Sequence, residues 1–222
     1  MKHNILYSFR RCPYAIRARW ALLNTNQAVE LREVDLKDKP IELIKISKKA
    51  TVPVLKTSLN EVIDESLDIM IWSLKRSNMS MLLRDNYDKS QEVLSLIEAN
   101  DKDFKYHLDR FKYASRYNVK DSETHQKACM KILLYLNDRL KDNSIKGKPL
   151  FLVDAKESLA DWAIWPFVRQ FRIADINNFD QNNEIKFLKI WLNYFFTHQK
   201  YQLVMKKYIP WSKKNKPLII GL

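Results

Sequence analysis

The sequence predicts an α/β domain over residues 1–77 and an all-helical bundle over residues 89–222, joined by a linker at residues 78–88. Short apolar runs alternate with amphipathic helical patterns in the first part, whereas long helical periodicity fills the second. The 222 residues are 46% hydrophobic and include six tryptophans, which is enough to bury a full core and excludes a disordered chain.

The first part is expected to run strand, helix, strand, helix, strand, strand, helix. A strand–helix–strand unit implies a right-handed crossover and a parallel pair of strands, and the closing hairpin adds an antiparallel edge. In chain order the expected elements are Ile5–Phe9, Pro13–Asn24, Val29–Val34, Pro40–Ser47, Thr51–Leu55, Glu61–Ile63 and Glu65–Ser77.

The second part shows four helical patterns. Ser158 and Asp161 open the third of them with a capping box in which aspartate replaces the usual glutamate. That helix is apolar on most sides, which predicts the central position in the bundle. The four expected helices are Lys89–Tyr117, Ser122–Leu140, Leu159–Ile173 and Asn183–His198.

Composition excludes several classes of protein. The net charge of +13 is spread along the chain without a recognisable nucleic-acid motif, so no nucleic-acid partner is expected. No apolar stretch is long enough to cross a membrane, and no export signal is visible. With only two cysteines, far apart, these observations favour a reducing compartment and a cytoplasmic location.

Cofactor signatures are also missing. The two glycines of the sequence are far apart, so it contains neither the phosphate-binding loop nor the dinucleotide-binding motif, which need several glycines close together. The four histidines are scattered, without an HExxH pair, and no CxxC pair exists. No metal site is expected.

Cys12 is the strongest candidate for chemistry. It falls at a strand-to-helix turn, with Pro13 at the first helical position, where proline is favoured. A thiol at a helix N-terminus feels the positive end of the helix dipole, and Arg10 and Arg11 add positive charge. These are the conditions that lower the pKa of a cysteine.

Pro53 interrupts the expected third strand. A proline cannot donate to a strand ladder, so it does not fit the middle of a central strand. A cis Val52–Pro53 bond at the start of the strand would resolve the conflict and turn the backbone of Val52 toward a ligand.

Taken together, the segments resemble the cytosolic glutathione transferases over nearly the whole chain, and most nearly their cysteine-bearing branch of omega-like and related bacterial enzymes. The resemblance implies a thioredoxin-like N-terminal domain that binds glutathione and a helical C-terminal domain. It rests on the order and spacing of Arg11-Cys12-Pro13-Tyr14-Ala15, Thr51-Val52-Pro53-Val54-Leu55, Asp64-Glu65-Ser66, and Ser158-Leu159-Ala160-Asp161 leading into Pro166-Phe167-Val168-Arg169.

The resemblance also implies a set of glutathione ligands. Val52, before cis-Pro53, would pair its backbone with the cysteinyl part of glutathione. At the start of the following helix, Ser66 and free N–H groups would hold the γ-glutamyl carboxylate, and Glu65 would pair with the ammonium. Lys39 matches a lysine that omega-like members aim at the glycyl carboxylate.

Some assignments stay open. Lys37 competes with Lys39 on charge alone, and the hydroxyls of Tyr7 and Ser8 are alternatives to Cys12, ranked below it. In this family an electrophile pocket draws on the second domain, where the candidates are Phe104, His107, Phe111 and Trp165. Cys129, inside a helical pattern, is expected to be a packed structural residue.

The implied function is a glutathione S-transferase with thiol transferase activity, acting on small electrophiles in detoxification or on glutathione mixed disulfides. Ala15 stands where a second thiol would be, so glutathione itself must complete the cycle as co-substrate. Cys12 is either the nucleophile or a stabiliser of the glutathione thiolate. The family also implies a homodimer. The alternative is a non-catalytic adaptor of the same fold that binds proteins.

Overall fold

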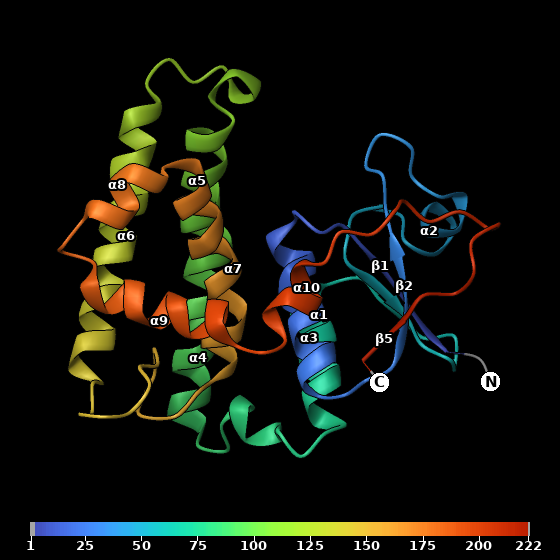
Figure 1. Cartoon of the computed structure of the whole chain (residues 1–222), viewed down its shortest axis with the longest axis horizontal. Coiled ribbons are helices and arrows are strands. Elements are labelled where there is room, and N and C mark those ends of the chain that lie inside the picture. The colour runs from blue at the N-terminus through green and yellow to red at the C-terminus, as the bar shows by residue number, and fades with distance from the viewer. Residues whose placement is uncertain (1–2, 222) are drawn as a thin grey trace. The chain divides into compact units, whose positions relative to one another are not determined.

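The computed structural model describes residues 3–221 and divides them into two compact units (Figure 1). Unit 1 holds the chain up to Ser80 together with the segment from Gln199 onward, and unit 2 is Met81–His198. The second domain was predicted to run from residue 89 to residue 222, whereas the segment after His198 lies in unit 1. Among residues 3–221, no helix has the length and apolar character that a membrane span requires.

Unit 1 is a five-stranded mixed sheet with helices on both faces. The strand order is β4-β3-β1-β2-β5, with β1 and β2 parallel and the other pairs antiparallel. The predicted parallel pair and closing hairpin are therefore confirmed. The elements are β1 (Asn4–Ser8), α1 (Pro13–Asn24), β2 (Val29–Glu33), α2 (Ile41–Ile46), β3 (Val54–Lys56), β4 (Val62–Ile63), α3 (Ser66–Lys75), α10 (Tyr201–Met205) and β5 (Ile219–Ile220).

Each face of the sheet has its own apolar core. On one face, α1 and α3 lie side by side and cover the sheet (Figure 1), with Leu22 and Ile69 packed against Leu6. On the other face, Leu43 of α2 packs against Tyr7. Alternate residues of β1 thus serve opposite faces, which is why the strand pattern could be recognised from the sequence.

The fifth strand was not predicted. Ile219 and Ile220 of β5 pair with β2, and two further backbone bonds attach the tail to the same strand: Leu31 N–H to Leu218 O (2.8 Å) and Trp211 N–H to Glu33 O (2.8 Å). The tail covers an edge of the sheet that would otherwise present unpaired backbone groups.

Gly221 allows the tail to pass close to the backbone of Gln27. Its φ is +83°, and a Cβ at this position would lie 2.3 Å from the carbonyl oxygen of Gln27. Only glycine fits a left-handed residue this close to another backbone.

Unit 2 is helical throughout its regular structure. The predicted helix Lys89–Tyr117 is divided into four segments, because a π-helical turn follows α4, and α5 ends at Lys112 before a 3-10 turn. The elements are α4 (Tyr87–Ala99), the π turn (Asn100–Phe104), α5 (Lys105–Lys112), a 3-10 turn (Ala114–Tyr117), α6 (Ser122–Asp142), α7 (Leu159–Ala174), α8 (Ile176–Gln181) and α9 (Lys186–Thr197).

Helix α7 is the buried helix of unit 2, as predicted, and its capping box is confirmed. The carboxylate of Asp161 accepts hydrogen bonds from Ser158 N–H (2.8 Å), Leu152 N–H (2.9 Å) and Trp191 Nε1–H (2.9 Å). One buried side chain therefore fixes the helix start, the preceding loop and helix α9.

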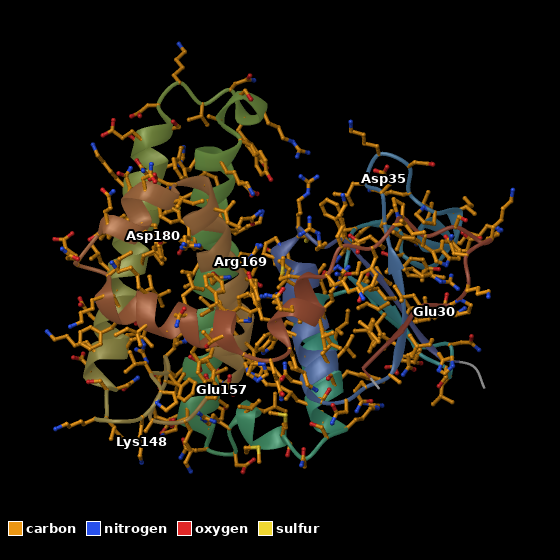
Figure 2. The ribbon with its side chains drawn as sticks, viewed as in Figure 1. Glu30, Asp35, Lys148, Glu157, Arg169 and Asp180 are labelled. Atoms are coloured by element: carbon orange, nitrogen blue, oxygen red, sulfur yellow. The ribbon has the colours of Figure 1, made fainter. Side chains whose placement is uncertain are left out.

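Glu157, labelled in Figure 2, lies one residue before this cap. Burial, reinforced by the nearby Asp161 carboxylate, raises the pKa of Glu157 to about 7. Between its ordinary pKa and this value, the folded chain binds a proton that the unfolded chain releases. The stabilisation is therefore complete at low pH and is lost as the pH rises through about 7.

We predict that Glu157→Gln removes this pH dependence. Wild type should lose on the order of 2 to 3 kcal/mol of unfolding free energy more than Glu157→Gln between about pH 5 and about pH 8, measured by urea denaturation. The exposed Glu184→Gln serves as control and should follow wild type. Parallel stability curves for wild type and Glu157→Gln would contradict the prediction.

Candidate functional site

Cys12 occupies the predicted strand-to-helix turn and is the N-cap residue of α1, with Pro13 at the first helical position. Its N–H donates to the carbonyl of Phe9 (3.0 Å), and its carbonyl accepts from Ile16 N–H (2.9 Å). The side chain is half-buried, and neither Cys12 nor Cys129 is in a disulfide. A thiol here lies close to the unpaired N–H groups of a helix start.

The fold brings Cys12 to the segment before β3. The Val52–Pro53 peptide bond is cis, as predicted, and β3 begins at Val54. The Cys12 sulfur donates a weak hydrogen bond to the carbonyl oxygen of Val52, 3.7 Å away. Two motifs 40 positions apart in sequence thus form one surface.

A buried ion pair fixes the turn that precedes Cys12. The Arg19 side chain of α1 is 1% exposed and pairs with the carboxylate of Glu33 at the end of β2. The other oxygen of that carboxylate accepts the backbone N–H of Arg10 (2.8 Å). Burial lowers the pKa of Arg19, and the charge of Glu33 opposes that effect. The sequence analysis did not identify this pair, although Glu33 follows Val29 and Leu31 on the buried face of β2.

The alternative hydroxyl donors are occupied inside unit 1. The Ser8 hydroxyl is fully buried and accepts from Arg19 Nε (2.7 Å). The Tyr7 hydroxyl accepts from Arg32 Nη1 (2.8 Å), whose Nε also pairs with Glu30, labelled in Figure 2. Burial raises the pKa of Tyr7. Both hydroxyls point into structural networks, whereas the Cys12 side chain is partly exposed.

Ser66 lies at the start of α3, where it was expected, and has a partner that the sequence analysis missed. The buried Arg17 of α1 donates from Nε to the Ser66 hydroxyl (3.0 Å), and its guanidinium lies 4.9 Å from the ring centroid of Tyr14. Arginine at this position falls on the buried face of α1, a pattern that could have marked it as paired. The result is a fixed hydroxyl beside a buried cation.

Glu65, the N-cap residue of α3, forms an exposed ion pair with Lys49. The hydrogen bond to Glu65 raises the pKa of Lys49. A ligand ammonium at Glu65 would compete with this lysine. Surface pairs of this kind contribute only about 0–1 kcal/mol, so the competition is weak.

The lysines and arginines that were considered as positive charges of the site differ in their surroundings. Lys39 is half-buried next to Pro40, while the competing Lys37 is exposed. Arg11 lies over the ring of Phe9, 5.3 Å from its centroid, and Arg10 contributes its backbone N–H to Glu33. The two arginines therefore build the turn as well as adding charge to it.

The candidates for the electrophile pocket in unit 2 fall into two groups, buried and partly exposed. Phe104 and Trp165 are 1% and 0% exposed and pack against Phe171 and Phe195 respectively, so they are core residues. Phe111 and His107 are partly exposed. Cys129 is buried as predicted, and burial raises the pKa of its thiol to about 12.

Comparison with known proteins finds one family model that matches part of unit 1. Residues 6–78, which include Cys12, Val52 and Ser66, match the family model described as glutathione S-transferase, N-terminal domain. No curated protein sequence matches the chain.

Several solved structures share the fold at low sequence identity. Ure2p in complex with glutathione has a TM-score of 0.78 and 16% identity, covering 91% of this chain and 98% of that one. The Tau class glutathione S-transferase from mango (Mangifera indica) has a TM-score of 0.76 and 22% identity, covering 92% and 93%. Glutathione transferase Omega 1C from Trametes versicolor has a TM-score of 0.74 and 17% identity, covering 93% and 92%. Residues 6–78 therefore match the glutathione S-transferase N-terminal domain, and the chain shares the fold of these solved structures over most of its length.

Proposed function

We propose that this protein is a glutathione-dependent transferase that uses Cys12 as its single reactive thiol. The observation that carries the proposal is the position of the Cys12 sulfur, at the start of α1 and 3.7 Å from the carbonyl of Val52 beside cis-Pro53. A ligand that paired with the backbone of Val52 would bring its own side chain to this sulfur.

Glutathione fits the remaining groups. Ser66 and the N-terminal N–H groups of α3 suit its γ-glutamyl carboxylate, and buried Arg17 adds positive charge there. Glu65 would take the ammonium and Lys39 the glycyl carboxylate. Ure2p, which has the same fold, is found in complexes with glutathione and with S-hexylglutathione, which supports glutathione as the ligand.

The proposed reaction is thiol transfer. The Cys12 thiolate attacks the glutathione sulfur of a mixed disulfide, the new bond joins Cys12 to glutathione, and the substrate leaves as a thiolate. A second glutathione thiolate then attacks the glutathione sulfur of that intermediate. Cys12 is released as a thiolate, and the product is glutathione disulfide. One free glutathione is consumed for each mixed disulfide reduced, and its oxidation balances the reduction of the substrate sulfur.

The surroundings of Cys12 favour this one-thiol cycle. Ala15, three residues later, is fully buried and carries no sulfur. Cys129 packs in the core of unit 2, with its sulfur 3.9 Å from the carbonyl of Phe104, and its raised pKa keeps it protonated. Glutathione is thus the thiol available to resolve the intermediate.

The first test is Cys12→Ser. We expect glutathione-dependent reduction of a mixed disulfide to fall to the uncatalysed rate, because serine cannot form the disulfide intermediate. Cys129→Ala is the matched control and should retain reduction. The same samples, incubated with glutathione disulfide, should gain a glutathione adduct only where Cys12 is present.

Conjugation of an aromatic electrophile is measured in parallel. A Cys12→Ser protein that loses reduction and gains conjugation supports thiol transfer, since serine stabilises a bound glutathione thiolate. Unchanged reduction in Cys12→Ser would show that Cys12 is not the nucleophile.

The second test is Ser66→Ala. Loss of a hydrogen bond to a charged group costs about 1.5–3 kcal/mol, so the glutathione Kd should rise about 10- to 100-fold in calorimetric titration. The exposed Ser58→Ala variant is the control and should bind as wild type. If wild type itself does not bind glutathione, the chain is better described as a non-catalytic adaptor with this fold.

A further inference from the structure

Two histidines meet in unit 2, and neither is among the residues proposed to bind glutathione. The Nδ1 atoms of His107 on α5 and His125 on α6 are 2.8 Å apart, and the ring centroids are 5.0 Å apart. Both side chains are partly exposed, so solvent ions reach them. The proposed glutathione chemistry gives this pair no role.

Rigid helices place the two rings. The π turn Asn100–Phe104 ends directly before α5. An additional residue in a helix rotates everything after it by about 100°, so this turn helps to set the direction of His107. Helix α6 starts at a firm cap, in which the Asp121 side chain accepts from two backbone N–H groups, and His125 follows within its first turns.

Aromatic contacts hold the rings in place. The exposed Tyr106 meets His107 and His125 edge-on, at centroid distances of 5.1 and 5.9 Å. Arg110 stacks on Tyr106, with its guanidinium carbon 3.4 Å from the ring centroid. The pair is therefore preorganised rather than formed by two free surface side chains.

The hydrogen bond between the rings requires that at least one of them is neutral. At 2.8 Å one ring nitrogen must donate and the other accept, because two N–H groups cannot face each other at this distance. Neutral imidazole is the common ligand of transition metals.

The separation of the two nitrogens fits adjacent ligands of one metal ion. Metal–nitrogen bonds of about 2.0–2.1 Å at a right angle place the two nitrogens about 2.9 Å apart, and at the tetrahedral angle about 3.3 Å apart. We propose that His107 and His125 form a binding site for a divalent transition-metal ion and that its geometry favours Cu²⁺ and Ni²⁺.

Binding requires a tautomer shift and a rotation of the rings. One ring moves its proton from Nδ1 to Nε2, and both rings turn so that their Nδ1 lone pairs point to the ion instead of along the line between the two nitrogens. Among the described residues, no group of three or more histidine, cysteine, aspartate or glutamate side chains could share an ion, so water completes the coordination. The site should therefore exchange its metal readily and prefer Cu²⁺ over Ni²⁺ and Zn²⁺, without binding Mg²⁺.

The other two histidines, His3 and His198, are treated separately in the experiment. All proteins carry His3→Gln and no histidine tag, because a histidine close to an amino terminus chelates Cu²⁺ and Ni²⁺ by itself. Ni²⁺ is titrated near neutral pH by calorimetry. Cu²⁺ is used only in a Cys12→Ser background, which prevents oxidation of the thiol, and is followed by electron paramagnetic resonance for nitrogen coupling from two imidazoles.

We expect one ion per chain in the His3→Gln protein. Adding His107→Gln or His125→Gln should weaken binding at least tenfold, since even outer partners of a metal site change affinity about 10- to 100-fold. Adding His198→Gln should leave binding unchanged. Far-ultraviolet circular dichroism confirms that each variant is folded. The proposal would be overturned if the His107→Gln and His125→Gln proteins bound the ion as tightly as the His3→Gln protein, or if the His3→Gln protein bound no ion.

Discussion

The buried ion pair of Arg19 and Glu33 is the interaction on which unit 1 depends most. It joins α1 to the end of β2, and the remaining polar atoms of each partner form hydrogen bonds with other segments of unit 1. Arg19 Nε donates to Ser8 of β1, and Arg19 Nη1 donates to the carbonyl of Val204 in α10 (3.3 Å). Glu33 takes the backbone N–H of Arg10. A buried charge is costly unless its hydrogen-bonding groups are satisfied, and this network supplies partners on every side.

The network has two consequences for the proposed site. It fixes the turn between β1 and α1 at Arg10, two residues before Cys12. It also ties the C-terminal segment to the same place, since α10 accepts from Arg19 and Trp211 donates to the backbone of Glu33. The tail is thus a structural part of unit 1, although more than a hundred residues separate it from the rest of that unit in the chain.

Much of this could be predicted from the sequence, because it rests on local signals. Pro13 after a strand pattern gave α1 its correct bounds, and Pro53 within a strand pattern led to the cis bond beside Cys12. Ser158 and Asp161 marked the start of α7. In each case a residue with a narrow backbone preference or a short-range hydrogen bond stands close to the feature that it specifies.

The missed features are those that depend on distant partners. Strand β5 is two residues long, too short for a periodic pattern, and only Gly221 in a glycine-poor chain hinted at a close backbone contact. Arg17 and Arg19 were counted as part of an amphipathic helix, although both side chains are buried and paired. The π turn before α5 has no sequence signature, and so the meeting of His107 with His125 could not be foreseen.

The central claim is that Glu33 holds the turn that presents Cys12, and amide hydrogen exchange tests it most directly. In Glu33→Gln the Arg10 amide loses its charged acceptor, worth about 1.5–3 kcal/mol, so its protection in nuclear magnetic resonance should fall about 10- to 100-fold. Glu30→Gln, on the same strand, should leave this amide unchanged. Unaltered protection of Arg10 in a folded Glu33→Gln protein would contradict the account.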